Sequence, residues 1–456
     1  MKNVRRIQPA FVIAACAAAG LCFAARAQQR PWQPPPAQPV PQEEGDPQAG
    51  EQEQMDEAAL SEAVGEAKAE RPAEVKQVPA AAANAVVQHI GHVQGLSLWH
   101  GARLSGDAYV AKTDDGKEAR LSIDPHLQSQ MQKLLKMYKP QGAALVAIDP
   151  KTGKVLAMAE YGEGQATKPL YPAASVFKII TGAALLESGV SPDDETCYHG
   201  GKHRMQARLL EDKPRLDRRC LSLSMALARS ANVVFAKMAV KHLDADSLRR
   251  EAEKFLFNRP IWDQPMEQSS AEIPDKDEKK VLDFAKSASG FGQVHLSPLH
   301  AAVIAAAVGN GGVAVEPSMI DAIDGERVAP TGESRLLNLE TAASLRDMMK
   351  LTVTAGTATA AFRERHHNSL GDIEVAGKTG SLSDHSRHFK DYSWFVGFAP
   401  ADDPKIAVAV VIVNGLKWRV HAPFVAREAL KAYLVGGPIG DPPVARVRHY
   451  RRRKHR

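Results

Sequence analysis

The clearest pattern in the chain is a set of apolar runs near both ends of its organised part. Two of them, at 143–148 and 155–159, flank a turn built from Asp, Pro, Lys, Thr and Gly, which predicts a β-hairpin. Two more, at 393–399 and 406–413, flank a second turn that is rich in Pro and Asp. We therefore expect strands early and late in one folded region.

The stretch between these strands is mostly helical in character. Long apolar runs occur in this stretch at 175–188, 222–242 and 298–310, and two further segments with helical apolar spacing flank the strands, at 127–137 and 425–434. Strands at both ends with helices between them predict an α/β (α+β) fold. In such a fold, one sheet is closed by segments that lie far apart in the sequence.

The first 27 residues have the pattern of an export signal. Four basic residues and no acidic one accompany an apolar run at 10–25, which is short for a membrane span of about 20 residues. Ala25-Arg26-Ala27 then offers an A-x-A cleavage pattern. We expect 1–27 to be a signal peptide, with an uncleaved anchor as the alternative. The chain is then exported to the periplasm or cell envelope, either free or tethered to the inner membrane.

Composition divides the rest of the chain into four parts. Residues 28–94 are rich in Pro, Gln, Glu and Ala and poor in large apolar residues, so we expect a disordered tether. Residues 95–120 predict a short lead-in hairpin around the turn Asp114-Asp115-Gly116. One folded domain then covers 121–436, and residues 437–456 form a basic tail.

The formal net charge of +5 is set by the ends of the chain, because the central domain is close to neutral. Basic residues crowd 446–456, whereas acidic residues dominate 28–80. In an exported protein, we expect the basic tail to contact anionic lipid head groups or envelope polymers and not nucleic acid. Export also argues against ATP as a substrate.

The candidate chemistry begins with Ser175 and Lys178. They are three residues apart at the start of a predicted helix, so their side chains share one face. A serine hydroxyl becomes a nucleophile only when a nearby base takes its proton. A lysine serves as that base when desolvation and a neighbouring cation lower its pKa. An isolated S-x-x-K pattern is nevertheless close to chance, so the pair needs further support.

Two further motifs supply that support. Ser230-Ala231-Asn232 places a hydroxyl and an amide on one short segment, although Ser and Asn are also ordinary helix caps. Lys378-Thr379-Gly380-Ser381 adds a lysine, two hydroxyls and a glycine that allows a substrate backbone to approach a strand. We interpret the earlier Lys151-Thr152-Gly153 as turn residues. A phosphate-binding P-loop is disfavoured, because position 372 is Asp and not Gly.

In this order, the three motifs resemble the transpeptidase domain of penicillin-binding proteins and serine β-lactamases. Further stretches extend the resemblance, at 123–128, 147–158, 292–299, 356–358 and 393–400. The resemblance implies an antiparallel sheet flanked by helices, with a mostly helical inserted half, and covalent binding of penicillin and other β-lactams. One departure is Ser381, where many transpeptidases have Thr.

The resemblance also implies roles for individual residues. The implied catalytic residues are Ser175, Lys178, Ser230 and Lys378, and the implied substrate-binding residues are Asn232, Thr379, Gly380 and Ser381. The expected reaction is D,D-transpeptidation, in which a Ser175 acyl-enzyme cross-links peptidoglycan stem peptides without a cofactor or metal. A D,D-carboxypeptidase or a serine β-lactamase with the same site is the alternative. An alternative of another class is a non-catalytic β-lactam sensor or envelope scaffold.

Two cysteines and two histidines leave a choice between a zinc site and a disulfide. Cys197, His199, His203 and Cys220 offer suitable ligand types, but their spacing fits no common zinc pattern. Export favours oxidised cysteines. We therefore expect a disulfide between Cys197 and Cys220, with zinc as the weaker alternative.

Overall fold

The computed structural model describes residues 95–437, apart from short gaps at 263–267, 278, 331, 365–366, 386–387 and 418. The expected signal segment, the tether and the basic tail from residue 438 onward lie outside the described residues. Within the described part, no helix has the length and apolar character needed to cross a membrane.

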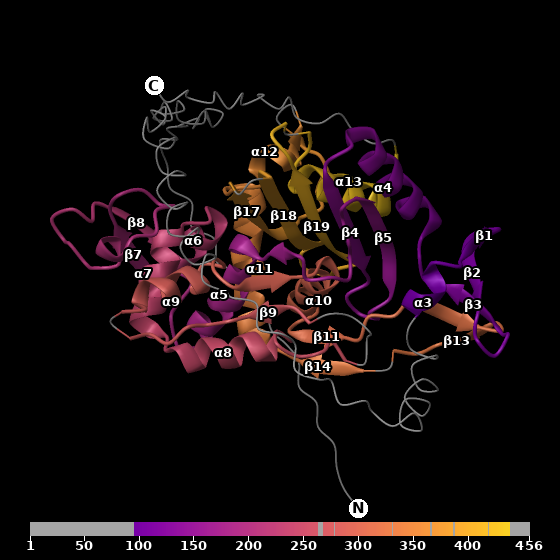
Figure 1. The fold of residues 1–456 in the computed structure, drawn as a ribbon, viewed down its shortest axis with the longest axis horizontal. Coiled ribbons are helices and arrows are strands. Elements are labelled where there is room, and N and C mark those ends of the chain that lie inside the picture. Colours follow the sequence, from indigo (N-terminus) through magenta and orange to yellow (C-terminus); the bar gives the residue numbers. More distant parts are fainter. Residues whose placement is uncertain are drawn as a thin grey trace, which may run out of the picture. The chain divides into compact units, whose positions relative to one another are not determined.

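The centre of the fold is a five-stranded antiparallel sheet with the strand order β17-β18-β19-β4-β5 (Figure 1). Its strands are β17 (Ala376–Asp384), β18 (Lys390–Ala399), β19 (Ile406–Asn414), β4 (Gly142–Ile148) and β5 (Val155–Gly162). The early hairpin and the late strands meet where β19 pairs with β4, with Val410 opposite Leu145. The prediction that distant segments close one sheet is therefore confirmed.

Helices cover both faces of this sheet. Because side chains along a strand alternate between the two faces, neighbouring residues pack into opposite cores. On β19, Val410 belongs to the core that also contains α4 (Pro125–Tyr138) and α13 (Ala422–Leu434). Its neighbour Val411 belongs to the opposite core, which contains α10 (Pro298–Gly309). A strand buried on both faces needs apolar residues throughout, which explains the unbroken apolar run of β19. The helix α10 is apolar all round because it is buried along most of its length.

A mostly helical half is inserted between β5 and β17 (Figure 1). Besides α10, its helices include α5 (Lys178–Glu187), α6 (Leu223–Ala228), α7 (Asn232–His242), α8 (Ala245–Lys254), α9 (Val281–Ala288) and α11 (Leu339–Thr354). Its shorter elements are β6 (Tyr171–Pro172), η1 (Ala174–Phe177), β7 (Glu195–Tyr198), η2 (Ala207–Leu209), β8 (Arg219–Ser222), β9 (Ser270–Ala271), β10 (Val294–Leu296), β11 (Val313–Val315), β14 (Glu333–Arg335), α12 (Thr359–Phe362), β15 (Arg363–Glu364) and β16 (His367–Asn368). The helix α11 packs against α5, α6 and β17, and so joins the helical half to the edge of the sheet.

The prediction of one continuous helix is wrong. The sequence predicted helical structure throughout 222–242, but α6 ends at Ala228 and α7 begins at Asn232. The break lies at Ser230, whose φ of 54° falls in the left-handed region that the interior of an α-helix does not contain. Ser230 therefore occupies a turn between two helices and not a helix face.

The lead-in is more extensive than the predicted hairpin. The helix α3 (Gly95–Trp99) and the strands β1 (Arg103–Ser105), β2 (Ala108–Lys112) and β3 (Glu118–Leu121) precede the central sheet. Within one five-stranded sheet, β3 pairs not only with β2 but also with β12 (Ile320–Ile323), which pairs in turn with β13 (Glu326–Arg327). The lead-in is thus hydrogen-bonded to a segment that lies well inside the expected 121–436 domain.

Candidate active site

Ser175 lies in the short 3-10 turn η1, which runs directly into α5, and Lys178 is the first residue of that helix. The structure brings Lys178 Nζ to 2.8 Å from Ser175 Oγ, in agreement with the three-residue spacing. Lys178 is fully buried, whereas Ser175 keeps 6% of its surface exposed. The amine is therefore removed from solvent while the hydroxyl retains a small accessible surface.

Lys178 Nζ has two further partners, both of which only accept hydrogen bonds. They are Asn232 Oδ1 at 2.8 Å and the main-chain oxygen of Ser289 at 3.1 Å. A neutral lysine amine has two N–H bonds and one lone pair. When these two oxygens accept the two N–H bonds, the lone pair is left for the proton of Ser175. The arrangement fits a general base for the serine hydroxyl.

The electrostatic surroundings favour the neutral form of Lys178. Desolvation and, secondarily, the positive charge of Lys378 lower the pKa of Lys178 well below its ordinary value. In the described part of the chain, the hydrogen-bond partners of Lys178 Nζ are a hydroxyl, an amide oxygen and a main-chain oxygen, so no carboxylate among them restores the charged form. A lysine in this position is therefore a free amine at a lower pH than an exposed lysine.

A second serine–lysine pair lies beside the first. Lys378 Nζ donates to Ser230 Oγ at 3.0 Å and to the Thr379 main-chain oxygen at 2.7 Å. Desolvation of the fully buried side chain lowers the pKa of Lys378 to about 7. Ser230, with its left-handed conformation, lies in the turn between α6 and α7, and this turn presents its hydroxyl to Lys378 of β17. A hydroxyl bonded to a lysine with a pKa of about 7 is suited to passing a proton in either direction.

The Lys378-Thr379-Gly380-Ser381 segment lies on β17, an edge strand of the central sheet among the described strands. Thr379 Oγ1 is 2.5 Å from Thr357 Oγ1, and the amide of Thr357 donates to the Ala228 oxygen just before Ser230. A Cβ at Gly380 would lie 3.1 Å from Trp394 Cβ and 3.2 Å from Val176 Cγ2. The glycine therefore has a packing reason as well, because it lets β17 lie against the turn that holds Ser175.

The turn that holds Ser175 also depends on a glycine of a neighbouring segment. Gly290 has a φ of 89°, and a Cβ there would lie 1.7 Å from the Ala174 carbonyl oxygen. The Gly290→Ala variant must strain its backbone and displace Ala174, the residue before Ser175. We expect a loss of about 1–3 kcal/mol in stability, measured by thermal unfolding, and slower labelling of Ser175 by penicillin.

The matched control for this prediction is Gly189→Ala. Gly189 has a φ of 90°, but a Cβ there would meet no atom within 4 Å. The control shares the backbone strain and lacks the clash. Equal slowing of acylation in both variants would contradict the role given to the contact with Ala174.

The predicted disulfide between Cys197 and Cys220 is confirmed. The two residues are direct partners across the antiparallel strands β7 and β8, with Cα atoms 3.9 Å apart. Their sulfurs are consumed by the bond and are not available to a zinc ion. In the part of the chain that the structure describes, no cluster of three or more His, Cys, Asp or Glu residues is arranged to hold a metal.

The sheet, the helical half and the two serine–lysine pairs are those of a serine-type acyl-transfer enzyme. Residues 143–431 match the family model described as the penicillin binding protein transpeptidase domain. The chain therefore belongs to the penicillin-binding protein transpeptidase family. This match confirms the predicted resemblance, and the solved structures of the same fold confirm the predicted fold class.

Relatives and solved structures agree with this placement. The chain is 26% identical over 384 residues to the peptidoglycan D,D-transpeptidase PbpA of Mycobacterium tuberculosis, covering 74% of this chain and 76% of that protein. The D,D-transpeptidase domain structure from Eggerthella lenta is 27% identical, with a TM-score of 0.57 over 69% of this chain and 82% of that one. Penicillin-binding protein A from M. tuberculosis, solved as an imipenem acyl-enzyme, shares the fold at 23% identity and a TM-score of 0.58, over 70% and 79% of the two chains.

Proposed function

We propose that this chain is a peptidoglycan D,D-transpeptidase that works through an acyl-enzyme on Ser175 and is acylated by β-lactams at the same residue. The observation that carries the proposal is the environment of Lys178, a fully buried amine bonded to Ser175 Oγ and to two oxygens that only accept. The similarity to the M. tuberculosis peptidoglycan D,D-transpeptidase PbpA supports the same reaction and substrate.

In the proposed acylation step, Lys178 takes the proton of Ser175 as the serine oxygen attacks the carbonyl between the two terminal D-alanines of a stem peptide. The bond from Ser175 Oγ to that carbonyl carbon forms, and the negative charge moves to the carbonyl oxygen. Main-chain N–H groups of Ser175 and Ser381 are the proposed donors to this oxyanion. Each such donor lowers the activation free energy by about 2.7–4 kcal/mol, because the negative charge that it stabilises develops only in the transition state.

Collapse of this intermediate releases the terminal D-alanine, whose amine must gain a proton. Ser230 is the proposed donor, since its hydroxyl is bonded to Lys378 and lies on the turn beside the first pair. Thr379, Ser381 and Lys378 are proposed to hold the terminal carboxylate, and Asn232 the peptide backbone. The Ser175 ester is then resolved by an amine from a neighbouring stem peptide or by water.

The cellular setting of this proposal is the envelope. The export pattern of residues 1–27 and a peptidoglycan substrate are consistent with each other, because the polymer lies outside the cytoplasm. The basic tail is proposed to contact anionic envelope surfaces. Solved proteins of this fold form acyl-enzymes with imipenem and penicillin G, and the same chemistry is proposed here for Ser175.

The proposal is tested by incubating the exported part of the chain with a stem pentapeptide and an amine acceptor. We expect release of D-alanine together with cross-linked product, and loss of both after preincubation with benzylpenicillin. The measurement is the ratio of cross-linked to hydrolysed peptide by mass spectrometry.

Other outcomes would select the alternatives. Hydrolysed peptide alone indicates a D,D-carboxypeptidase, and rapid turnover of benzylpenicillin indicates a β-lactamase. Stable labelling by penicillin without any D-alanine release indicates a sensor or scaffold.

A further inference from the structure

A loop that begins and ends at the disulfide reaches the Ser230-Ala231-Asn232 motif through His203. The main-chain oxygen of His203 accepts a hydrogen bond of 3.1 Å from Asn232 Nδ2. The oxygen of Lys202 accepts from the amide of Val233 at 3.1 Å. The loop therefore contacts the amide side chain of the motif and the first turn of α7.

The His203 carbonyl decides which way the Asn232 side chain faces. A carbonyl accepts and never donates, so only the NH₂ group of Asn232 can bond to it. Asn232 Oδ1 is then directed to Lys178, 2.8 Å from Nζ. In the reverse orientation, the NH₂ group would compete with the Ser175 hydroxyl for the lone pair of the neutral amine. The loop thus selects the orientation that leaves this lone pair to Ser175.

The base of the loop is held by a buried lysine as well as by the disulfide. Cys197 and Cys220 join β7 to β8, and Lys237 of α7 donates to the Cys197 oxygen at 2.8 Å. Lys237, which anchors the loop, and Asn232, which the loop orients, both belong to the rigid helix α7. A shift of the loop base relative to α7 is therefore passed on to the contact between His203 and Asn232.

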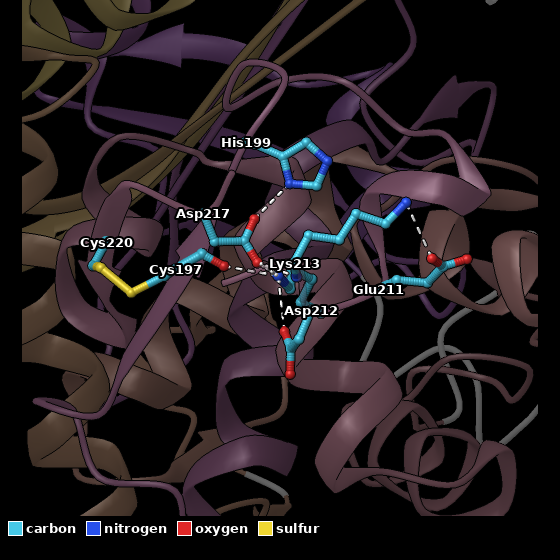
Figure 2. Close-up of polar contacts among 8 residues, drawn as sticks. Cys197, His199, Glu211, Asp212, Lys213, Asp217 and Cys220 are labelled. Carbon is cyan, nitrogen blue, oxygen red and sulfur yellow. Dashed lines mark hydrogen bonds and ion pairs between the residues drawn. A yellow bond between two sulfur atoms is a disulfide. The ribbon is translucent and has the colours of Figure 1, made fainter. Parts of the chain in front are cut away.

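The same lysine also pairs with two carboxylates inside the loop. Lys237 Nζ lies 3.0 Å from Asp217 Oδ2 and 2.9 Å from Asp212 Oδ1, although only 3% of the lysine side chain is exposed. Figure 2 shows Asp217 close to the disulfide and turned toward His199, whose Nδ1 is 2.5 Å from Asp217 Oδ1. A buried ammonium needs such partners, and together they fix the path of the loop.

We propose that Lys237 is a positioning residue for acylation, which acts with the Cys197–Cys220 disulfide to hold the 198–219 loop so that His203 fixes the orientation of Asn232. This inference rests on the acylation of Ser175 proposed above. Within the described part of the chain, the polar partners of Lys237 Nζ are the Cys197 oxygen, Asp217 and Asp212, and neither Ser175 nor Lys178 is among them. It acts only through the loop and Asn232.

The test compares Lys237→Met with Lys241→Met, an exposed lysine on the same helix. Each is made in the Asn232 background and in the Asn232→Ala background, and the rate constant of acylation by benzylpenicillin is measured in all four proteins. When Asn232 is present, we expect Lys237→Met to slow acylation about tenfold or more. This loss is part of the rate enhancement of about 10²–10⁴-fold that a positioned general base supplies. With Ala at 232, we expect Lys237→Met to have little further effect, because the residue that the loop orients is gone.

Equal slowing in both backgrounds, or acylation as fast as in Lys241→Met, overturns the inference while leaving the proposed function intact. A wild-type chain that penicillin does not acylate overturns the proposed function and this inference with it. If Lys237→Met does not fold, the folded wild type is treated with a reductant, since Cys220 is exposed. We expect acylation to slow about tenfold after reduction and to recover on reoxidation, with no such change in Asn232→Ala. Unchanged acylation of fully reduced protein overturns the inference.

Discussion

The Ser175→Ala variant is expected to lose covalent labelling by a fluorescent penicillin entirely. The methyl group has no oxygen to form the ester, and among the described residues Ser175 Oγ, at 2.8 Å, is the hydroxyl bonded to Lys178 Nζ. Removing the nucleophile of another serine acyl-transfer enzyme lowers the rate by about 10⁶-fold, so labelling falls below detection. The measurement is in-gel fluorescence of protein incubated with the label at a fixed time.

The matched control is Ser188→Ala at the other end of α5, where the hydroxyl only bonds to the Leu185 oxygen. We expect normal labelling of this variant and near-normal thermal unfolding of both variants, because the Ser175 hydroxyl contributes to chemistry more than to packing. Labelling of Ser175→Ala as strong as that of the wild type would contradict the assignment of the nucleophile.

Much of the central sheet was accessible to sequence reasoning, because each of its strands carries a distinctive local pattern. The β4–β5 hairpin follows from two apolar runs around a turn of Asp, Pro and Gly residues, and β19 from an unbroken apolar run. The pairing of β3 with β12 was missed. Both strands are short, and pairing between strands so far apart depends on how the whole chain packs and not on local pattern.

The break at Ser230 was missed for a related reason. Apolar residues continue on both sides of the motif and favour one long helix, whereas the left-handed φ of Ser230 has no signature in the residue itself. The turn is supported from outside, since the Ala228 oxygen accepts from the amide of Thr357, far along the chain. Tertiary contacts thus override the local helical preference at the turn where the Ser230 hydroxyl meets Lys378.

In the site, the sequence pointed to the side chains and not to the main-chain groups that surround them. The resemblance of the three motifs to a known family implied Ser175, Lys178, Ser230, Asn232 and Lys378, and the structure brings these residues together. The sequence did not predict the main-chain oxygens of Ser289 and His203, which complete the surroundings of Lys178 and Asn232. Every residue carries a main-chain oxygen, so only the fold reveals which of them are used.

The base assignment gives the second large expected effect. Desolvation and the charge of Lys378 lower the pKa of Lys178, so the free amine exists at a lower pH than in an exposed lysine. Below that pKa, Lys178 is protonated and cannot accept the proton of Ser175. Above it, the amine is free. The rate constant of acylation by benzylpenicillin should therefore rise with pH as Lys178 loses its proton, and then level off.

The Lys178→Met variant is expected to acylate about 10²–10⁴-fold more slowly than the wild type, and to lose this rise with pH. The matched variant is Lys178→Arg, which keeps a cation but never releases its proton under these conditions. If Lys178 acts as the base, both variants are slow. If its charge alone mattered, Lys178→Arg would retain acylation near the wild-type rate, and that result would reject the base. The comparison is informative because Lys178 touches Asn232 and Ser289 as well as Ser175, so a lost contact and a lost base must be told apart.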